Sequence, residues 1–395
     1  MVTLIRNGTV YAPEPLGRKD ILILDRTIGA VAEPGSLALG GLEIEEVEAS
    51  GRSILPGIID PHVHLLGGGG EGGPATRAPE IQVEDIVRSG VTTLIGCLGT
   101  DGVTRHMTSL LAKARALEIE GVTTFIFCGS YDLPVQTITG SVRSDLVLID
   151  KVIGAGEVAL SDHRSSQPTF EDLAKLAAEC RVGGMLGGKA GVLHCHLGDG
   201  PRRLELLFRL VRETEIPITQ VMPTHMNRNR ALFEQGLEFL KIGGAIDLTA
   251  GTEPQDESDG DLSVESAIRA IQAQNLSLSQ VTVSSDSNGS LPVFNAQGEL
   301  TGLTIATEDA LLRTFRSLIG RKILTLETAA RVFAANPARF YKLNAKGRIA
   351  AGKDADLIIL DADLRLTDVF ALGRRMMADG RLLARGTFSP NPGQA

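Results

Sequence analysis

The chain has 395 residues, of which 43% are hydrophobic and 22% are charged, and its formal net charge is −9. This length and composition fit a large α/β domain with a small additional one, and no window has the composition of a disordered segment. The acidic charge, with no basic stripe to reverse it, argues against a nucleic-acid partner.

The sequence also lacks the signals of a membrane or exported protein. No apolar run approaches the roughly 20 residues that a membrane-spanning helix needs, and residues 1–8 enter a strand-like alternation without the order of a signal peptide. The cysteines lack paired spacing and lie in apolar runs, so we interpret them as reduced core thiols. They are Cys97, Cys128, Cys180 and Cys195. We expect a soluble cytoplasmic protein with no membrane partner.

Both ends of the chain are predicted to be rich in β-strands. Short alternating runs broken by turn residues occupy residues 1–54, at 3–7, 20–25, 27–32 and 43–48. The stretch 347–395 has the same character, with a strand at 355–361 and hairpin arms at 369–372 and 374–377. We therefore expect one small sheet domain assembled from residues 1–54 and 347–395.

Between these ends, residues 55–346 alternate strands with helices, which is the signature of a parallel sheet. The apolar run 54–65 is predicted to be the first strand, and seven others follow at 92–98, 123–129, a run ending at 162, 191–196, 218–225, 245–249 and 281–286. Helices are expected at 104–119, 169–186, 203–215, 229–242, 262–274 and 306–320, with the shortest connection near 80–89. Eight such units close naturally as a (β/α)₈ barrel. The alternative is a doubly wound open sheet, but no glycine-rich dinucleotide fingerprint follows the first strand.

A His-x-His pair, His62 and His64, lies at the end of the first predicted strand. Alternate residues of a strand project from the same face, so both imidazoles can reach one metal ion. The glycines Gly67 to Gly70 and the acidic residue Glu71 follow at once. A loop after the C-terminal end of a strand is where a (β/α)₈ barrel carries its active site, so this position favours a metal site.

Four other titratable residues are expected at the same end of the barrel. They are Glu157 on the fourth strand, His196 on the fifth, His225 on the sixth and Asp286 on the eighth. Any one of them could be an ordinary hydrogen-bonded polar residue, but six coinciding by accident is much less expected. Imidazole and carboxylate groups suit zinc, and six are too many for one tetrahedral zinc with an open position. They suit two ions that share a bridging carboxylate and a bridging hydroxide.

The remaining histidines are interpreted differently. His194 is two residues before His196 and is expected to be a satisfied core histidine, although it could form a second pair. His106 is expected at the surface. His163 is placed either at the surface or just behind the metal ligands.

Several segments together resemble a known family. They are Gly57 to His64, Gly67 to Glu71, Thr137 to Val142, Ser161 to Ser165, Pro223 to Asn229 and Ser284 to Ser290. This set resembles the isoaspartyl (β-aspartyl) dipeptidases, binuclear zinc enzymes of the amidohydrolase superfamily, and the stretch 347–357 is common to many amidohydrolases. The resemblance implies a (β/α)₈ barrel with a small β-sandwich and a homo-octamer. It also implies hydrolysis of the β-aspartyl amide bond of isoaspartyl dipeptides.

The chemistry expected from this resemblance uses two zinc ions per subunit. We assign His62, His64 and Asp286 to one ion and His196 and His225 to the other, with Glu157 and a hydroxide between them. Asp286 is also expected to pass the proton of the attacking water to the leaving amine. Tyr131, at the end of the third strand, is the expected hydrogen-bond donor to the scissile carbonyl, with a structural hydroxyl as the alternative.

Substrate selection is expected to rest on charge matching. An isoaspartyl dipeptide carries one ammonium and two carboxylates, so Glu71 matches the ammonium and Arg164 and Arg228 match the carboxylates. Ser290 adds a hydroxyl, and Thr100 is a weaker candidate.

The bridging position departs from the commonest pattern of the superfamily, in which a lysine carboxylated by CO₂ joins the metals. The position that matches this lysine holds Glu157, and the nearest lysine, Lys151, lies six residues upstream. The glutamate carboxyl is nearer the backbone, so the strand must approach the metals more closely. Gly154 and Gly156 would permit a local bulge that does so. We expect no carbamylated lysine, at Lys151 or at Lys189.

Two other functions remain open from the sequence. One is another amidohydrolase, either a cyclic amidase of the dihydroorotase or hydantoinase type or an N-acyl-amino-acid deacylase. These enzymes need no acidic residue to bind a substrate ammonium group, so the presence of Glu71 argues against both. The other is a metal-free scaffold on the same barrel, which the complete ligand set disfavours.

Overall fold

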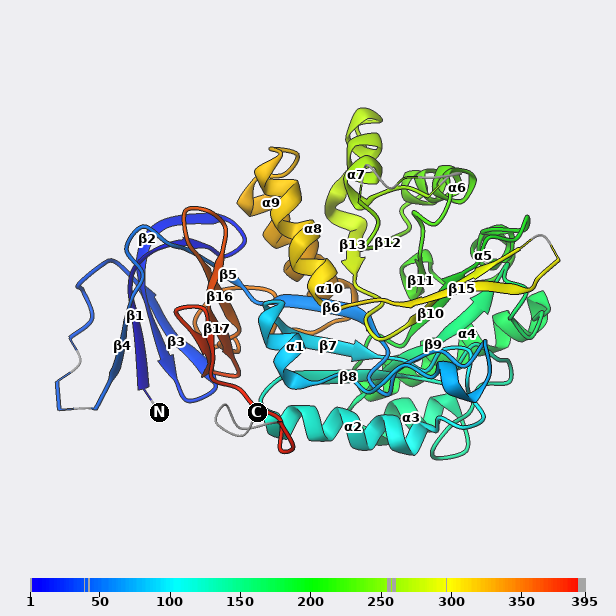
Figure 1. Ribbon diagram of the computed structural model, residues 1–395, viewed down its shortest axis with the longest axis horizontal. Helices are drawn as coiled ribbons and strands as arrows, with labels where there is room; N and C mark the ends of the chain where they lie inside the picture. Colours follow the sequence, from blue (N-terminus) through cyan, green and yellow to red (C-terminus); the bar gives the residue numbers. More distant parts are fainter. Residues whose placement is uncertain are drawn as a thin grey trace.

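The structure, a computed structural model, describes residues 2–38, 40–41, 43–253, 257, 261–295 and 297–389. Figure 1 shows a sheet built from both ends of the chain beside a larger α/β body, with α2 and α3 below the central strands and α6 and α7 above them. No helix in these ranges is long and apolar enough to cross a membrane.

The terminal sheet contains strands from both ends of the chain. Its order is β19-β18-β17-β16-β5-β1-β2-β3, and β4 also pairs with β1. The strands are β1 (Val2–Tyr11), β2 (Pro15–Leu24), β3 (Thr27–Ala32), β4 (Glu45–Glu48), β5 (Ser53–Pro56), β16 (Leu357–Leu360), β17 (Leu366–Ala371), β18 (Arg374–Ala378) and β19 (Arg381–Leu382). Strand β5 joins the two ends, because it pairs with β1 on one side and with β16 on the other. The sheet has a hydrophobic core of its own, which includes Ile5, Ile21, Ile54 and Phe370. One sheet therefore contains strands from both ends of the chain, and β17 and β18 pair as the predicted hairpin.

Eight strands alternate with helices in the central body, as predicted. They are β6 (Ile58–Val63), β7 (Val91–Gly96), β8 (Thr123–Cys128), β9 (Val152–Leu160), β10 (Val192–Leu197), β11 (Val221–Thr224), β12 (Ile246–Thr249) and β13 (Val281–Ser284). The first six form one parallel sheet in chain order, and β12 and β13 form a parallel pair. Backbone hydrogen bonds join the two groups at both edges, from Met226 to Asp247 and from Asp286 to His62. This arrangement is consistent with a closed barrel.

Apart from α3, the connecting helices lie close to the predicted ranges. They are α1 (Val83–Arg88), α2 (Met107–Glu120), α3 (Val142–Leu148), α4 (Phe170–Gly187), α5 (Glu205–Glu213), α6 (Arg230–Lys241), α7 (Val264–Ala273) and α8 (Asp309–Gly320). Local sequence explains the ends of α4, since Thr169 and Asp172 form a reciprocal capping box and Gly188 closes the helix in the left-handed region.

Three elements have no counterpart in the predictions. They are the helix α3, the hairpin of β14 (Ser290–Phe294) and β15 (Leu300–Ile305), and the helical stretch of α9 (Leu326–Ala330), the π-helical turn η5 (Arg331–Ala335) and α10 (Asn336–Phe340).

The apolar run 54–65, predicted as one strand, is two strands in different sheets. Strand β5 belongs to the terminal sheet and β6 to the central one, and Gly57 lies between them. A Cβ atom at Gly57 would lie 2.2 Å from the Thr92 hydroxyl oxygen, so only glycine lets the chain pass this close to β7.

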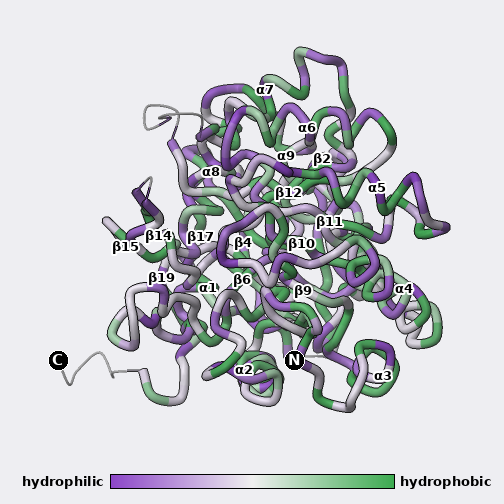
Figure 2. The backbone as a smooth tube through the Cα atoms, turned by 90° about the vertical axis from the view of Figure 1, so that its right-hand side faces the viewer, coloured by the Kyte–Doolittle hydropathy of each residue, from purple (hydrophilic) through white to green (hydrophobic). Residues whose placement is uncertain are grey.

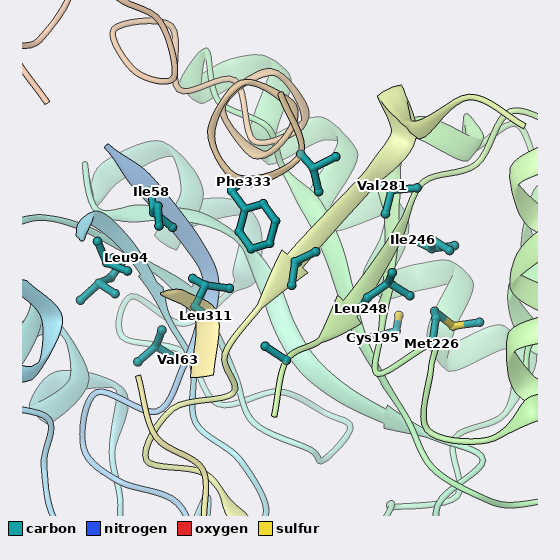
Figure 3. Packing of buried hydrophobic residues seen from close by; sticks show 14 of the residues in the cluster. Ile58, Val63, Leu94, Cys195, Met226, Ile246, Leu248, Val281, Leu311 and Phe333 are labelled. Atoms are coloured by element: carbon teal, nitrogen blue, oxygen red, sulfur yellow. The ribbon is translucent and has the colours of Figure 1, made fainter. Parts of the chain in front are cut away.

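Most of the buried hydrophobic side chains form one core between the central strands and their helices. In Figure 3, Phe333 of η5 lies between Ile58 of β6 and Val281 of β13, where the first and last central strands meet. Figure 2 shows hydrophobic and hydrophilic residues alternating along α4 and α7, as expected for helices with one buried face. This packing fixes the C-terminal ends of the strands, where the predicted site residues lie.

Candidate active site

A cavity of about 940 Å³ opens at the C-terminal ends of the central strands. Its lining includes the metal-ligand candidates His64, His196, His225 and Asp286, and the substrate-binding candidates Thr100, Arg164, Arg228 and Ser290. The hairpin of β14 and β15 forms part of its wall. Four of the six metal-ligand candidates therefore face one cavity together with four of the five substrate-binding candidates.

All six predicted metal ligands lie together around Glu157. The carboxylate oxygens of Glu157 lie 3.3 Å from His62 Nε2, 3.3 Å from His64 Nε2, 3.1 Å from His196 Nδ1 and 3.7 Å from His225 Nε2. Asp286 Oδ1 lies 3.0 Å from His64 Nε2 and 3.4 Å from His62 Nε2. All six side chains are buried. Glu157 thus lies at the centre of the cluster, with its Oε2 beside His62, His196 and His225 and its Oε1 beside His64.

Two atoms of this cluster have no hydrogen-bond partner, although they are fully enclosed. They are His62 Nε2 and Asp286 Oδ1. A buried polar atom without a partner costs about 1–3 kcal/mol, and here both atoms face a group of nitrogen and oxygen donors. A divalent cation satisfies such atoms, so the donor set fits a metal site.

Backbone conformation supports a special role for two of these residues. His225 and Asp286 follow directly on β11 and close to β13, and both adopt a left-handed backbone, with φ of 62° and 55°. This conformation is uncommon for residues other than glycine and is found preferentially at functional sites.

Strand β9 contains the local irregularity expected near Gly156. Its register with β10 shifts so that Ala155 pairs with Leu193 while Val158 pairs with Cys195, which leaves one extra residue in β9. Gly156 has φ of 151°, and a Cβ atom there would lie 2.5 Å from the backbone oxygen of His194. The bulge directs Glu157 into the cluster.

The lysines near β9 point elsewhere. Lys151 precedes the strand, pairs with Glu118 and donates a 2.9 Å hydrogen bond to the backbone oxygen of Thr124. Lys189 donates to the backbone oxygen of Ile149. Neither lysine lies in the cluster.

Burial and neighbouring charge shift the pKa of Glu157, the candidate bridging ligand, in opposite directions. Burial would raise the pKa of the Glu157 carboxyl, but the positive charge of His62 and the hydrogen bond from His196 hold this pKa well below its ordinary value. Glu157 is therefore an anion, as a bridging ligand must be.

Three groups behind the histidines orient them. His194 Nε2 lies 2.7 Å from His62 Nδ1, and Asp162 Oδ2 lies 3.0 Å from His196 Nε2. The Thr249 hydroxyl lies 2.7 Å from His225 Nδ1. Partners of this kind fix the tautomer and the direction of metal-ligating histidines.

His194 is buried and satisfied, as predicted. Its ring stacks on Phe127 at 4.5 Å, and its Nδ1 lies 3.2 Å from the hydroxyl of Tyr341. The sequence did not reveal the contact of His194 with His62. It also did not single out Asp162, although this residue lies just after the end of β9, next to Ser161.

Four of the five predicted substrate-binding residues meet at Glu71. Its carboxylate accepts hydrogen bonds from Thr100 at 3.0 Å and Ser290 at 2.9 Å, and it lies 3.4 Å from the Arg164 guanidinium. Arg164 also binds the Asp162 carboxylate through two nitrogens, at 2.7 and 3.0 Å. The fifth residue, Arg228, lines the same cavity and makes no hydrogen bond or ion pair from its side chain to a described residue.

The loop that carries Glu71 is held by a residue that the sequence did not reveal. The buried Arg105 guanidinium donates to the backbone oxygens of Gly68 at 2.7 Å, Gly69 at 3.3 Å and Leu66 at 3.3 Å. A cation that binds three carbonyls of a loop fixes the path of that loop.

Tyr131 points its hydroxyl into the cluster, 2.9 Å from His196 Nδ1. Burial and the negative charge of Glu157 raise the pKa of this phenol well above its ordinary value, so it keeps its proton at neutral pH. A protonated phenol can donate a hydrogen bond, which the role predicted for Tyr131 requires.

The other histidines lie away from the cluster. His106 is exposed at the start of α2, as predicted. His163 is exposed at the rim of the cavity with its ring 4.7 Å from that of Phe294. The prediction that it could lie behind the metal ligands is wrong, because the turn after β9 directs Asp162 inward and His163 outward.

The sequence profile of the amidohydrolase family matches residues 53–383. The chain belongs to the amidohydrolase family. Among curated proteins, this amidohydrolase is 26% identical over 206 residues to a dihydroorotase of Pelotomaculum thermopropionicum, a match that covers 49% of this chain and 42% of the dihydroorotase. The chain thus matches less than half the length of that relative.

Solved structures give similarity over nearly the whole chain. The amidohydrolase is 48% identical to the β-aspartyl dipeptidase of thermophilic, keratin-degrading Fervidobacterium islandicum AW-1 in complex with the β-Asp-Leu dipeptide. The similarity covers 97% of this chain and 98% of that one, with a TM-score of 0.90. A second structure of that dipeptidase gives 46% identity and a TM-score of 0.88 at the same coverage. These matches confirm the resemblance to isoaspartyl dipeptidases.

More distant structures share the fold alone. The dihydropyrimidinase of Brevibacillus agri NCHU1002 is 16% identical, with a TM-score of 0.66 over 99% of this chain and 100% of that one.

Proposed function

We propose that this amidohydrolase is an isoaspartyl dipeptidase that hydrolyses the β-aspartyl amide bond with the help of two zinc ions. The observation that carries the proposal is the Glu71 cluster, because the partners of Glu71, namely Thr100, Arg164 and Ser290, line the same cavity as the metal-ligand candidates. An acid for the substrate ammonium beside arginines for its carboxylates matches an isoaspartyl dipeptide. The similarity to a dipeptidase in complex with β-Asp-Leu supports the same substrate.

The proposed ligand sets follow the distances within the cluster. His62, His64 and Asp286 hold one ion, and His196 and His225 hold the other. Glu157 contacts both sets and is the proposed bridge, with no carbamylated lysine. When bound, two zinc ions lower the pKa of a shared water to give hydroxide and polarise the scissile carbonyl.

Asp286 is the proposed proton carrier. One of its oxygens, Oδ1, lies beside His62 and His64. Its carboxylate takes the proton from the attacking water and delivers it to the nitrogen of the leaving amino acid.

Tyr131 donates its phenolic hydrogen to the oxygen of the scissile carbonyl, where negative charge develops. Its raised pKa keeps this hydrogen in place throughout the physiological range.

Substrate binding uses the charges around the cavity. Glu71 binds the α-ammonium, supported by Thr100 and Ser290. Arg164 and Arg228 each bind a carboxylate through paired hydrogen bonds, which for Arg164 requires exchange of its contacts with Asp162 or Glu71. Arg228 has no competing partner among the described residues, so its guanidinium is available to the substrate.

The surrounding architecture is proposed to be a closed (β/α)₈ barrel over residues 55–346 and a β-sandwich formed by residues 1–54 and 347–395. The hydrogen bonds between β13 and β6 and between β11 and β12 support the closure. We further propose a cytoplasmic homo-octamer, on the resemblance to the family alone.

A substrate panel tests the proposed function. Purified zinc-loaded protein is assayed on β-Asp-Leu, α-Asp-Leu, dihydroorotate and N-acetyl amino acids. We expect kcat/KM on β-Asp-Leu to exceed that on α-Asp-Leu by well over tenfold, with no turnover of the other two classes. Preference for dihydroorotate or an N-acetyl amino acid would instead support a cyclic amidase or a deacylase and would refute the dipeptidase.

A further inference from the structure

A thiol lies beside the proposed metal ligands and has no place in the mechanism above. Cys97 directly follows β7, at the same end of the strands as the histidines, and its side chain is buried. Its sulfur lies 3.9 Å from His64 Nδ1 and 4.0 Å from Glu157 Oε1. One donor atom from each of His62, His64, Cys97 and Glu157 lies within 4.8 Å of the others.

These separations are close to those of ligands on one metal ion. At Zn–S and Zn–N distances of about 2.3 and 2.0 Å, two ligands of a tetrahedral zinc lie roughly 3.5 Å apart. The sulfur lies 4.0 Å from Glu157 Oε1, only about half an ångström farther than two ligands of one ion would be. A small rotation of the side chain closes this difference.

An independent observation points to a cation beside this sulfur. His62 Nε2 and Asp286 Oδ1 are buried atoms with no hydrogen-bond partner. His62 belongs to the same donor group as Cys97. Besides His64 and Glu157, the sulfur has a long contact, 3.6 Å, to the backbone oxygen of Val63.

The other three cysteines differ from Cys97 in their surroundings. Cys128 lies 3.1 Å from the Asp145 carboxylate, and burial raises its pKa far above the ordinary value. Burial also raises the pKa of Cys180, in α4, to about 12. Among the donor groups of the described residues that could hold a metal, Cys97 is the cysteine that takes part.

We propose that Cys97 is a thiolate ligand of the zinc ion held by His62 and His64. This inference rests on the proposed metal-dependent function. When the ion binds, the S–H bond gives its proton to the solvent and the sulfur lone pair forms the bond to zinc, with no change in oxidation state.

A thiolate here has two chemical consequences. It adds a third negative charge to those of Glu157 and Asp286, against the four positive charges of two zinc ions. It also makes the site softer, which favours zinc and cobalt over magnesium and manganese.

X-ray absorption spectroscopy at the zinc edge tests this assignment on the zinc-loaded protein. We expect a sulfur shell at about 2.3 Å in the wild type, in addition to nitrogen and oxygen at about 2.0 Å. Cys97→Ala should lose the sulfur shell, while the matched control Cys180→Ala, in a helix away from the cluster, should retain it. In the cobalt-substituted protein, the near-ultraviolet sulfur-to-cobalt absorption should follow the same pattern.

The outcomes separate this inference from the proposed function. Two zinc ions per chain with only nitrogen and oxygen neighbours in the wild type would overturn the thiolate ligand and leave the metal enzyme intact. A wild-type protein that retains no zinc would overturn the proposed function itself. The wild-type spectrum decides the question even if Cys97→Ala does not fold.

Discussion

Asp286 combines two proposed roles that a single substitution separates. In Asp286→Asn the amide oxygen can still ligate a metal ion, but the side chain can no longer carry a proton. We expect the variant to retain most of its zinc and to lose at least a hundredfold in kcat on β-Asp-Leu. Metal content by plasma emission and steady-state kinetics measure both quantities. Parallel loss of zinc and activity would reduce Asp286 to a ligand.

Glu71 sets the charge preference of the proposed site. Its carboxylate is held by Thr100, Ser290 and Arg164, and Glu71→Gln keeps its shape while removing its charge. A buried charged hydrogen bond contributes about 1.5–3 kcal/mol, so we expect kcat/KM on β-Asp-Leu to fall about 10- to 100-fold. Zinc content should not change. An unaltered rate would show that Glu71 does not bind the ammonium.

At the scale of elements, the sequence predicted which residues lie at the ends of the strands. It did not predict the hydrogen bonds that orient the proposed metal ligands. Hydrophobic runs located β6 to β13, and the strand-end rule for parallel sheets placed His62, Glu157 and Asp286 at one edge. Glycines near Glu157 predicted the bulge in β9. The contact of His194 with His62 joins β10 to β6 across the interior, and no local pattern in the sequence carries that information.

Short or exposed elements were not predicted from the sequence, and the reason is physical. The hairpin of β14 and β15 exposes apolar residues such as Val293 and Leu291 over the cavity, so it lacks the alternation that marks a strand with one buried face. Helix α3 spans only Val142–Leu148, too short to show a helical period. Both elements depend on contacts with the rest of the molecule.

The glycine-rich loop offers a test at this scale. Arg105 binds three of its carbonyls, and Arg105→Lys replaces a fork of donors by one point charge. We expect kcat/KM on β-Asp-Leu to fall about 10-fold through a higher KM, because Glu71 loses its fixed position while the metal ligands stay in place. Arg88→Lys, on the exposed face of α1, is the matched control and should leave the kinetics unchanged. An Arg105→Lys enzyme with wild-type KM would contradict the role of this loop.

At the scale of the whole molecule, the metal cluster joins strands from all around the central body. Each proposed ligand comes from a different strand or strand end apart from the pair His62 and His64, so bound zinc links the strands to one another. A ligand that binds the folded state alone stabilises it by about 4 kcal/mol at a thousandfold excess over its Kd. We therefore expect chelation of zinc to lower Tm by roughly 5 °C in scanning calorimetry, and zinc to restore it. Glu157→Ala should show little of this response, and an equal response in that variant would place the stabilising metal elsewhere.

The account as a whole rests on two zinc ions joined by Glu157 without a carbamylated lysine. The most direct test is a zinc titration of the metal-free protein in buffer free of CO₂, followed by the rate of β-Asp-Leu hydrolysis after each addition. We predict that activity rises to a maximum at two zinc ions per chain and that added bicarbonate changes neither the maximum nor the stoichiometry. Activity that requires bicarbonate, or that never appears at two zinc ions per chain, would contradict the account.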